Sequence, residues 1–323
     1  MVHKNETMPR KGVALWLFGA LIISIALNIF LSLDWLSDRA DKYPYLSKRL
    51  FAENVNNIVI NFVPLRAKLR DYVAHAPKRT GVYFEYLPTG VSIGVNEKDV
   101  FFSASLVKLP TVMRFYKLID EGKIKSSKPI TLKDEYIDKG FGELWRRGSG
   151  AQVSTQELID AVTKTSDNTA FRAIQDLIKP FNTYQDDKHS LRDVYNYLDI
   201  TEDEAGGNAG ITPKNFSSIL RSLYLSAYLP YSLSNEILKD LSESEFNDWL
   251  PEPLPQEIKI AHKFGLYNAE PHEFAVHSDC GIVYYPQRPY VLCVMVNTYD
   301  GAVAQKEIRD LSKSVYDYIK DIK

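Results

Sequence analysis

An uncharged apolar run near the N-terminus constrains this chain more than any other feature. Residues 12–33 read GVALWLFGALIISIALNIFLSL and contain no charged side chain. At a rise of 1.5 Å per residue, a helix of this length crosses about 30 Å of hydrocarbon. Lys4, Arg10 and Lys11 precede the run, and the positive-inside rule then keeps residues 1–11 in the cytoplasm. The sequence therefore predicts a single-pass cell-membrane anchor, with the rest of the chain outside the cytoplasm.

A cleaved signal peptide is the alternative to an anchor. The apolar run is longer than a typical signal core of about 7–15 residues, and no A-x-A-like cleavage site follows it closely. We therefore favour an uncleaved anchor. The expected organisation is a cytoplasmic tail over 1–11, the anchor over 12–33, a juxtamembrane stalk over 34–62 and one folded domain over 63–323.

The folded domain is predicted to begin with a helix and a hairpin. Leu65, Leu69 and Val73 recur at helical spacing behind Pro64, a favourable residue for a first helical turn. Two runs of alternating polarity then flank the turn sequence LPTG, which predicts a β-hairpin. The pattern SASLVKLPTVMRFYKLIDEGK follows directly and predicts a largely apolar helix that ends near Gly122.

The middle of the domain has helical patterns, and its end returns to strands. A capping box at 154–157 precedes one helix, and further helices are expected near 169–178 and 213–229. Three strand patterns begin near residue 257. The closing helix places four apolar residues on one face: Ile308, Leu311, Val315 and Ile319. We expect an α+β fold, in which an antiparallel sheet is flanked by helices and an all-α subdomain is inserted.

Ser105-Leu-Val-Lys108 is an S-x-x-K element at the start of the first apolar helix after the hairpin. Residues three apart share a helix face, so Lys108 Nζ is expected within reach of Ser105 Oγ. A serine hydroxyl needs a base to remove its proton, and a lysine serves when burial or a nearby cation lowers its pKa. A helix cap followed by a surface lysine is the alternative interpretation.

Two further elements follow in the chain. Ser166 is suited to relay a proton, and Asn168, two residues on, is suited to hold a substrate amide and orient the lysine of the S-x-x-K element. The alternative is a turn that only caps the next helix. Lys263 lies in an apolar strand, and Gly265 leaves room for a substrate backbone. The alternative is an edge-strand lysine that discourages aggregation.

Taken in this order, S-x-x-K, S-D-N and K-x-G resemble the signature set of the penicillin-recognising serine enzymes, the class A β-lactamases and penicillin-binding proteins. The resemblance is closest to the class A branch and covers roughly residues 65–323. It includes the segments SASLVKLP, QELIDAVTKTSDNTAFRAI, ITPKNFSSILRSL and SDCGIVYYP. The joint match is far more specific than any single motif.

The resemblance implies a role for each matching position. Ser105 would be the acylated nucleophile and Lys108 its base. Ser166 would relay the proton to the leaving nitrogen. Lys263 would add positive charge for the substrate carboxylate and lower the pKa of Lys108. The oxyanion hole would be formed by the backbone N–H groups of Ser105 and Leu266.

The chain departs from the family pattern at two places. Phe264 stands where the family has a hydroxyl that binds the substrate carboxylate, and losing a hydrogen bond to a charged group costs about 1.5–3 kcal/mol. The class A element E-x-x-L-N, whose glutamate activates the deacylating water, is missing from LDITEDEAGGNAGITP. Glu202 and Glu204 are stand-ins for it, with solvated surface acids as the alternative. We therefore expect acylation with slow deacylation.

Three functions stay open at this point. The first is D,D-peptidase-like acyl transfer on a D-Ala-D-Ala-type cell-wall peptide, with β-lactams as analogues of that substrate. The second is a true class A β-lactamase. The third is a membrane-tethered binding or sensor module without turnover.

Net charge and residue composition limit the classes of partner and cofactor that we expect. The net charge of −2 makes nucleic acid an unexpected partner. The six histidines lack H-x-H and H-x-x-x-H spacing, so we expect no metal and no cofactor. Cys280 and Cys293 lie in one predicted hairpin, either as two small buried residues or as a cross-strand disulfide.

Overall fold

A computed structural model describes most of the chain. The described residues are 16–29, 42–45, 60–182, 191–200, 210–269 and 274–322. The helices are α2 (Val63–His75), α3 (Lys108–Asp120), α4 (Thr155–Lys164), α5 (Asn168–Ile178), α6 (Arg192–Tyr197), α8 (Pro213–Tyr224), α9 (Tyr231–Ser242) and α10 (Gly301–Asp321). The strands are β1 (Arg79–Tyr86), β2 (Val91–Val95), β3 (Phe101–Phe102), β4 (Ile130–Thr131), β5 (Gln152–Val153), β6 (Gly210–Ile211), β7 (Ile260–Ala269), β8 (Phe274–Val283) and β9 (Tyr290–Asn297). Short 3₁₀ turns are η2 (Ala104–Val107), η3 (Asp134–Tyr136), η4 (Leu144–Arg147) and η5 (Lys179–Phe181).

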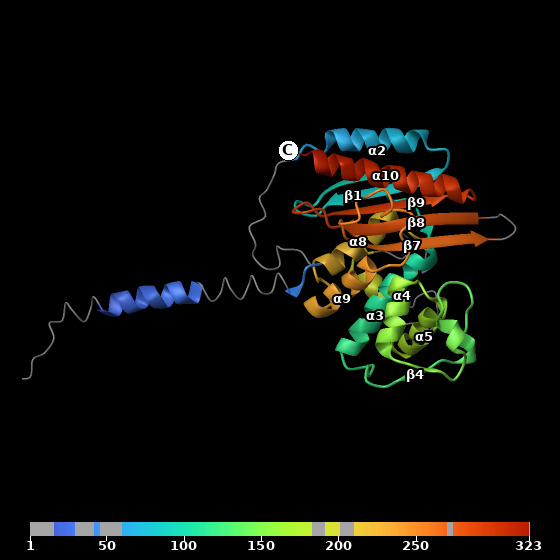
Figure 1. Cartoon of the computed structure of the whole chain (residues 1–323), viewed down its shortest axis with the longest axis horizontal. Helices are drawn as coiled ribbons and strands as arrows, with labels where there is room; N and C mark the ends of the chain where they lie inside the picture. The colour runs from blue at the N-terminus through green and yellow to red at the C-terminus, as the bar shows by residue number, and fades with distance from the viewer. Residues whose placement is uncertain are drawn as a thin grey trace, which may run out of the picture.

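The main sheet has five antiparallel strands in the order β2-β1-β9-β8-β7. Its strands come from both ends of the folded domain, and the helical middle of the chain is inserted between them, as predicted. Helices α2 and α10 cover one face of the sheet, while α3, α4 and α5 form a helical body beyond β7 (Figure 1). The α+β prediction is confirmed. Strand β7 is the sheet edge that borders the helical body.

Local sequence signals explain the elements on which the fold rests. The apolar residues predicted to share one face of α2, and those of α10, are all buried in one core cluster. Ser154 and Glu157 form the predicted capping box, in which each side chain accepts a backbone N–H from the other residue. Helix α9 was not predicted, although Leu233, Ile237 and Leu241 recur at helical spacing within it.

The described part of the predicted stalk docks onto the domain. Tyr45 is buried in the core cluster that lies between the sheet and the helical body. Its hydroxyl accepts hydrogen bonds from Ser242 Oγ at 3.0 Å and Lys259 Nζ at 3.5 Å, and its carbonyl accepts one from Tyr284 Oη at 3.0 Å. The segment over 42–45 is therefore part of the folded domain. The remainder of the predicted stalk up to residue 59 lies outside the described residues.

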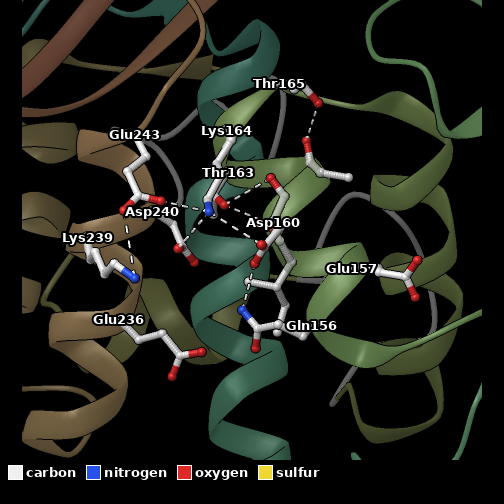
Figure 2. A network of polar contacts seen from close by, with 12 residues as sticks. Gln156, Glu157, Asp160, Thr163, Lys164, Thr165, Glu236, Lys239, Asp240 and Glu243 are labelled. Carbon is white, nitrogen blue, oxygen red and sulfur yellow. Dashed lines mark hydrogen bonds and ion pairs between the residues drawn. The ribbon is translucent and has the colours of Figure 1, made fainter.

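A polar network joins α4 to α9 (Figure 2). Lys164 Nζ lies 2.8 Å from a Glu243 carboxylate oxygen and 3.6 Å from Asp240 Oδ1. The other oxygen of Asp240 is buried without a hydrogen-bond partner. Burial, followed by the charge of Asp160, raises the pKa of Asp240 to about 6. This contact between helices far apart in the sequence is therefore sensitive to pH.

Two further predictions concern the cysteine pair and the membrane anchor. Cys280 and Cys293 face each other across β8 and β9 and form a disulfide, so the cross-strand alternative holds. Residues 16–29 of the predicted anchor are helical, while its two ends lie outside the described residues. Within the residues that the structure describes, no helix is both long and apolar enough to span a membrane. The anchor stays a prediction.

Candidate active site

Ser105 lies in the 3₁₀ turn η2, directly before α3. The preceding residue, Ala104, has φ of 44°, a left-handed conformation that costs energy for any residue with a Cβ. Strained backbone of this kind concentrates at functional sites. Because the turn is followed at once by α3, Ser105 is presented at the N-terminal end of that helix.

Lys108 is the first residue of α3, and its side chain is buried. Its Nζ donates to the Ser166 carbonyl at 2.5 Å, to Ser166 Oγ at 3.2 Å and to Asn168 Oδ1 at 2.6 Å. In the described residues these contacts, rather than the expected one with Ser105 Oγ, hold the amine. Ser166 has φ of 56°, which lets both its carbonyl and its hydroxyl contact one amine. The first two motifs are thus brought together.

Burial sets the protonation of the two lysines. It lowers the pKa of Lys108 to about 7, against the opposing charges of Asp167 and Asp138. It also lowers the pKa of Lys263 far below the usual range, and the charge of Lys108 lowers it further. The sequence led us to expect that the charge of Lys263 lowers the pKa of Lys108. In the structure, burial is instead the main cause of the low pKa of Lys108. An amine with a pKa near 7 is half unprotonated at neutral pH and is able to accept a proton.

Strand β7 lies against the turn that carries Ser105. A Cβ at Gly265 would meet the Ser103 carbonyl oxygen at 3.2 Å and Leu106 Cγ at 3.2 Å. Glycine therefore lets the strand lie close to the turn without displacing these atoms. The expected room for a substrate backbone at Gly265 stays a prediction. Leu266 follows on the same edge strand, with its side chain half-buried. This arrangement suits an oxyanion hole between β7 and η2.

Two carboxylates beside Lys108 have structural partners. Asp167 Oδ1 caps α5 by accepting from Ala170 N, and its Oδ2 accepts from Leu144 N, both at 2.8 Å. The S-D-N turn therefore caps α5, as the alternative interpretation proposed. It also lies beside Lys108, so the two interpretations hold together. Burial would raise the pKa of Asp138, but hydrogen bonds from Asn168 and from a backbone N–H outweigh it and hold that pKa below its usual value. Asp138 is therefore a weak base, and both carboxylate oxygens of Asp167 already accept hydrogen bonds.

Some parts of this site were not predicted, and others lie beyond the described residues. Asp138 and Phe141 belong to a segment for which the sequence analysis predicts no role, although its sequence DKGFG carries turn signals. The predicted stand-ins Glu202 and Glu204 lie outside the described residues. Within the residues that are described, no group of three or more His, Cys, Asp or Glu side chains is arranged to hold a metal ion.

Comparison with solved structures identifies the fold. PBP-A aligns with a TM-score of 0.71 at 23% identity, over 80% of this chain and 97% of that chain. A β-lactamase from Sphaerobacter thermophilus aligns with a TM-score of 0.68 at 20% identity, over 81% of this chain and 99% of that chain. A mutant of PBP-A in an acyl-enzyme complex with penicillin G aligns with a TM-score of 0.70 at 24% identity, over 80% of this chain and 97% of that chain.

Sequence comparison identifies the family. No curated protein matches the sequence of this chain. A model of the Beta-lactamase enzyme family, in contrast, matches residues 64–319, which is nearly the whole folded domain. The match spans η2, the S-D-N turn and β7. The chain is therefore a member of the Beta-lactamase enzyme family, on a fold that it shares with class A β-lactamases and PBP-A.

Proposed function

We propose that the protein is a membrane-tethered, extracytoplasmic serine acyl-transfer enzyme that acts on D-Ala-D-Ala-type cell-wall peptide, as D,D-peptidases and penicillin-binding proteins do. The observation that carries the proposal is the buried amine of Lys108. It lies three residues after Ser105, has a pKa of about 7, and is held by Ser166 and Asn168. Family membership supports a serine hydrolase, and the apolar run over 12–33 supports the tether.

In the proposed reaction, Ser105 Oγ forms a bond to the substrate carbonyl carbon while its proton passes to Lys108 Nζ. The backbone N–H groups of Ser105 and Leu266 would stabilise the oxyanion. The carbon–nitrogen bond then breaks, and the leaving nitrogen takes a proton from Ser166 Oγ, which Lys108 Nζ replaces. Water finally cleaves the Ser105 ester, which yields the acid and restores the hydroxyl.

Slow release of the acyl group is supported by the carboxylates that the described residues place near Lys108. Asp167 and Asp138, the two that the described residues place there, are committed to the α5 cap and to hydrogen bonds with Asn168 and Gly140. A carboxylate with such partners is a weak base for activating water. A persistent acyl-enzyme at Ser105 is thus favoured over rapid β-lactam turnover.

Intact mass spectrometry of the full chain tests this proposal. We expect excess penicillin G to add its mass to the wild-type protein, with the adduct on a peptide that contains Ser105, and expect no adduct on Ser105→Ala. The adduct should persist after free penicillin G is removed. Rapid loss of the adduct with hydrolysed product would favour a true β-lactamase instead. Absence of any adduct, with penicillin G and with its uncharged methyl ester, would favour a binding or sensor module.

A further inference from the structure

An aromatic cluster occupies the side of β7 where the family has a carboxylate-binding hydroxyl. Phe264 is only 3% exposed, and its ring stacks on Phe246 with centroids 4.0 Å apart. Trp249 contacts the Phe264 ring edge-on at 6.2 Å. A hydrocarbon ring covered in this way has no hydrogen bond to offer an anion. The substitution at 264 is therefore built into the packing of the site's wall.

Phe141 extends this cluster to the surface of the site. Its ring is 37% exposed and lies 5.8 Å from the Phe264 ring. The Phe141 carbonyl accepts from Asn168 N at 2.9 Å, which ties the loop to the S-D-N turn. Gly142 has φ of 84°, and a Cβ there would lie 2.0 Å from Asp167 Oδ2, so only glycine permits the approach. The exposed ring is thus held in place beside the catalytic residues.

A second aromatic pair lies farther along the same strand. Tyr267 is 41% exposed, and its ring centroid lies 4.6 Å from that of Phe102, the last residue of β3, which lies shortly before η2 in the chain. Aromatic surface therefore borders β7 at both ends of the segment formed by Lys263, Gly265 and Leu266. Such rims gain free energy when they contact apolar groups.

The charges around the segment do not favour an anion. Lys263 is 2% exposed, donates a 3.4 Å hydrogen bond to the Phe264 carbonyl, and has a pKa lowered by burial. His277 is buried near Trp249, and burial lowers its pKa, so it is uncharged at neutral pH. The carboxylates of Asp138 and Asp167 add negative charge beside Lys108.

We propose that this site selects substrates that carry an uncharged, apolar group where other members of the family bind a carboxylate. The inference rests on the proposed function, because it concerns the substrate that acylates Ser105. This narrows the D-Ala-D-Ala-type substrate of the proposed function to a peptide in which the carboxyl group near the scissile bond is masked, either by a further peptide bond or by esterification. Phe264 and Phe141 are its specificity-determining residues.

Penicillin G and its methyl ester form a matched pair of probes that differ only in the masked carboxylate. The rate of adduct formation at Ser105 is measured for both compounds with the full-length protein by intact mass spectrometry. We expect the wild-type protein to react with the ester about 10-fold or more faster than with the acid, because an unpaired carboxylate beside the aromatic cluster would lose hydration without gaining a hydrogen bond.

Phe264→Thr and Phe264→Val supply the matched variants, since their side chains have the same shape and only threonine offers a hydroxyl. We expect Phe264→Thr to shift the ratio of rates toward the acid by about 10- to 100-fold relative to Phe264→Val. Because both variants lose the stack on Phe246 equally, melting temperatures should change together and the ratio should isolate the hydroxyl. Phe141→Ala, which leaves the buried stack intact, should slow the ester more than the acid.

Three outcomes would overturn the inference. A wild-type preference for the acid would show that the site binds the carboxylate despite Phe264. An unchanged ratio in Phe264→Thr, together with an unchanged ratio in Phe141→Ala, would remove both residues as determinants. In these two cases adducts at Ser105 would leave the proposed function standing. Failure of both probes to modify Ser105 would reject the inference and the proposed function together.

Discussion

Replacing Asn168 by aspartate provides the sharpest test of Lys108 as the base. Asn168 Oδ1 lies 2.6 Å from Lys108 Nζ, and the substitution puts a negative charge at that position with almost no change of shape. The protonated amine gains an ion pair, whereas the neutral amine does not. The pKa of Lys108 should therefore rise from its value of about 7 toward that of an ordinary lysine.

The contact distance bounds the size of this effect. With an effective dielectric constant of about 20, two charges 2.6 Å apart attract by about 6 kcal/mol, which is an upper limit. Opposite charges in contact shift pKa values by about 1–3 units in folded proteins, so we expect about 2 units, or about 3 kcal/mol. The unprotonated fraction of Lys108 at neutral pH then falls about 50-fold, and acylation should slow by the same factor.

The assay is the pH dependence of adduct formation at Ser105. Wild-type rates should rise with pH and level off above about pH 7, because the neutral amine accepts the serine proton. In Asn168→Asp the curve should move about 2 pH units upward and reach a similar plateau. Asn168→Ala removes the acceptor without adding charge, and it should not move the curve upward. The double variant Asn168→Asp with Asp138→Asn leaves the net charge near Lys108 unchanged, because one carboxylate is gained and one is lost. The amide introduced at 138 still donates a hydrogen bond to the carboxylate introduced at 168.

Loss of activity alone would not support this account, since a misfolded site also loses activity. A rate in Asn168→Asp that stays low at every pH would point to damaged geometry. A curve that keeps the wild-type midpoint while activity remains would show that the titrating group is not Lys108. Only the second result would refute the assignment of Lys108 as the base.

Three further predictions concern the base, the docked segment and the polar network. Lys108→Arg should abolish adduct formation, because a guanidinium does not release its proton near neutral pH, and it should lower the melting temperature, because that charge is then fixed at a buried position. Tyr45→Ala should lower the free energy of unfolding in urea by about 3–5 kcal/mol, whereas Tyr45→Phe, which loses only the contacts to Ser242 and Lys259, should cost about 1 kcal/mol. Since the pKa of Asp240 is raised to about 6, the native state retains a proton that the unfolded chain releases from about pH 4 upward, so stability should fall as pH rises through that window. Asp240→Asn should flatten this slope and be more stable above about pH 6, by up to about 3 kcal/mol, in urea titrations at several pH values.

Local patterns in the sequence were sufficient for most of the fold. The helical face of α10, the capping box of α4 and the apolar run of β9 all lie within one element, so the local sequence alone reveals them. The docking of Tyr45 depends instead on Ser242 and Lys259, which lie nearly two hundred residues or more away. No local sequence pattern indicates such a contact, so the sequence alone predicts a stalk for this segment.

The same distinction applies to the site. Motif order indicated that Lys108, Ser166 and Lys263 would meet, and the structure brings them to one region. The hydrogen bond from Lys108 to the Ser166 carbonyl depends on a left-handed serine, which residue type alone does not indicate. The place of Phe141 depends on a glycine that fits against Asp167, which is likewise visible only once the chain is folded.

The alternation of side chains along β7 explains how recognition changes while the chemistry is retained. Gly265 faces the turn that carries Ser105, whereas the ring of Phe264, one residue earlier, packs against Phe246 and Trp249 and lies 5.8 Å from the ring of Phe141. A change at 264 therefore leaves the approach of β7 to η2 untouched. Because Lys108, Ser166 and Asn168 belong to the helical body, their hydrogen bonds are also independent of that position. A protein with this architecture is thus able to keep an acylation machinery and alter which substrate reaches it, and the pairing of Phe264→Thr with Asn168→Asp separates the two properties by experiment.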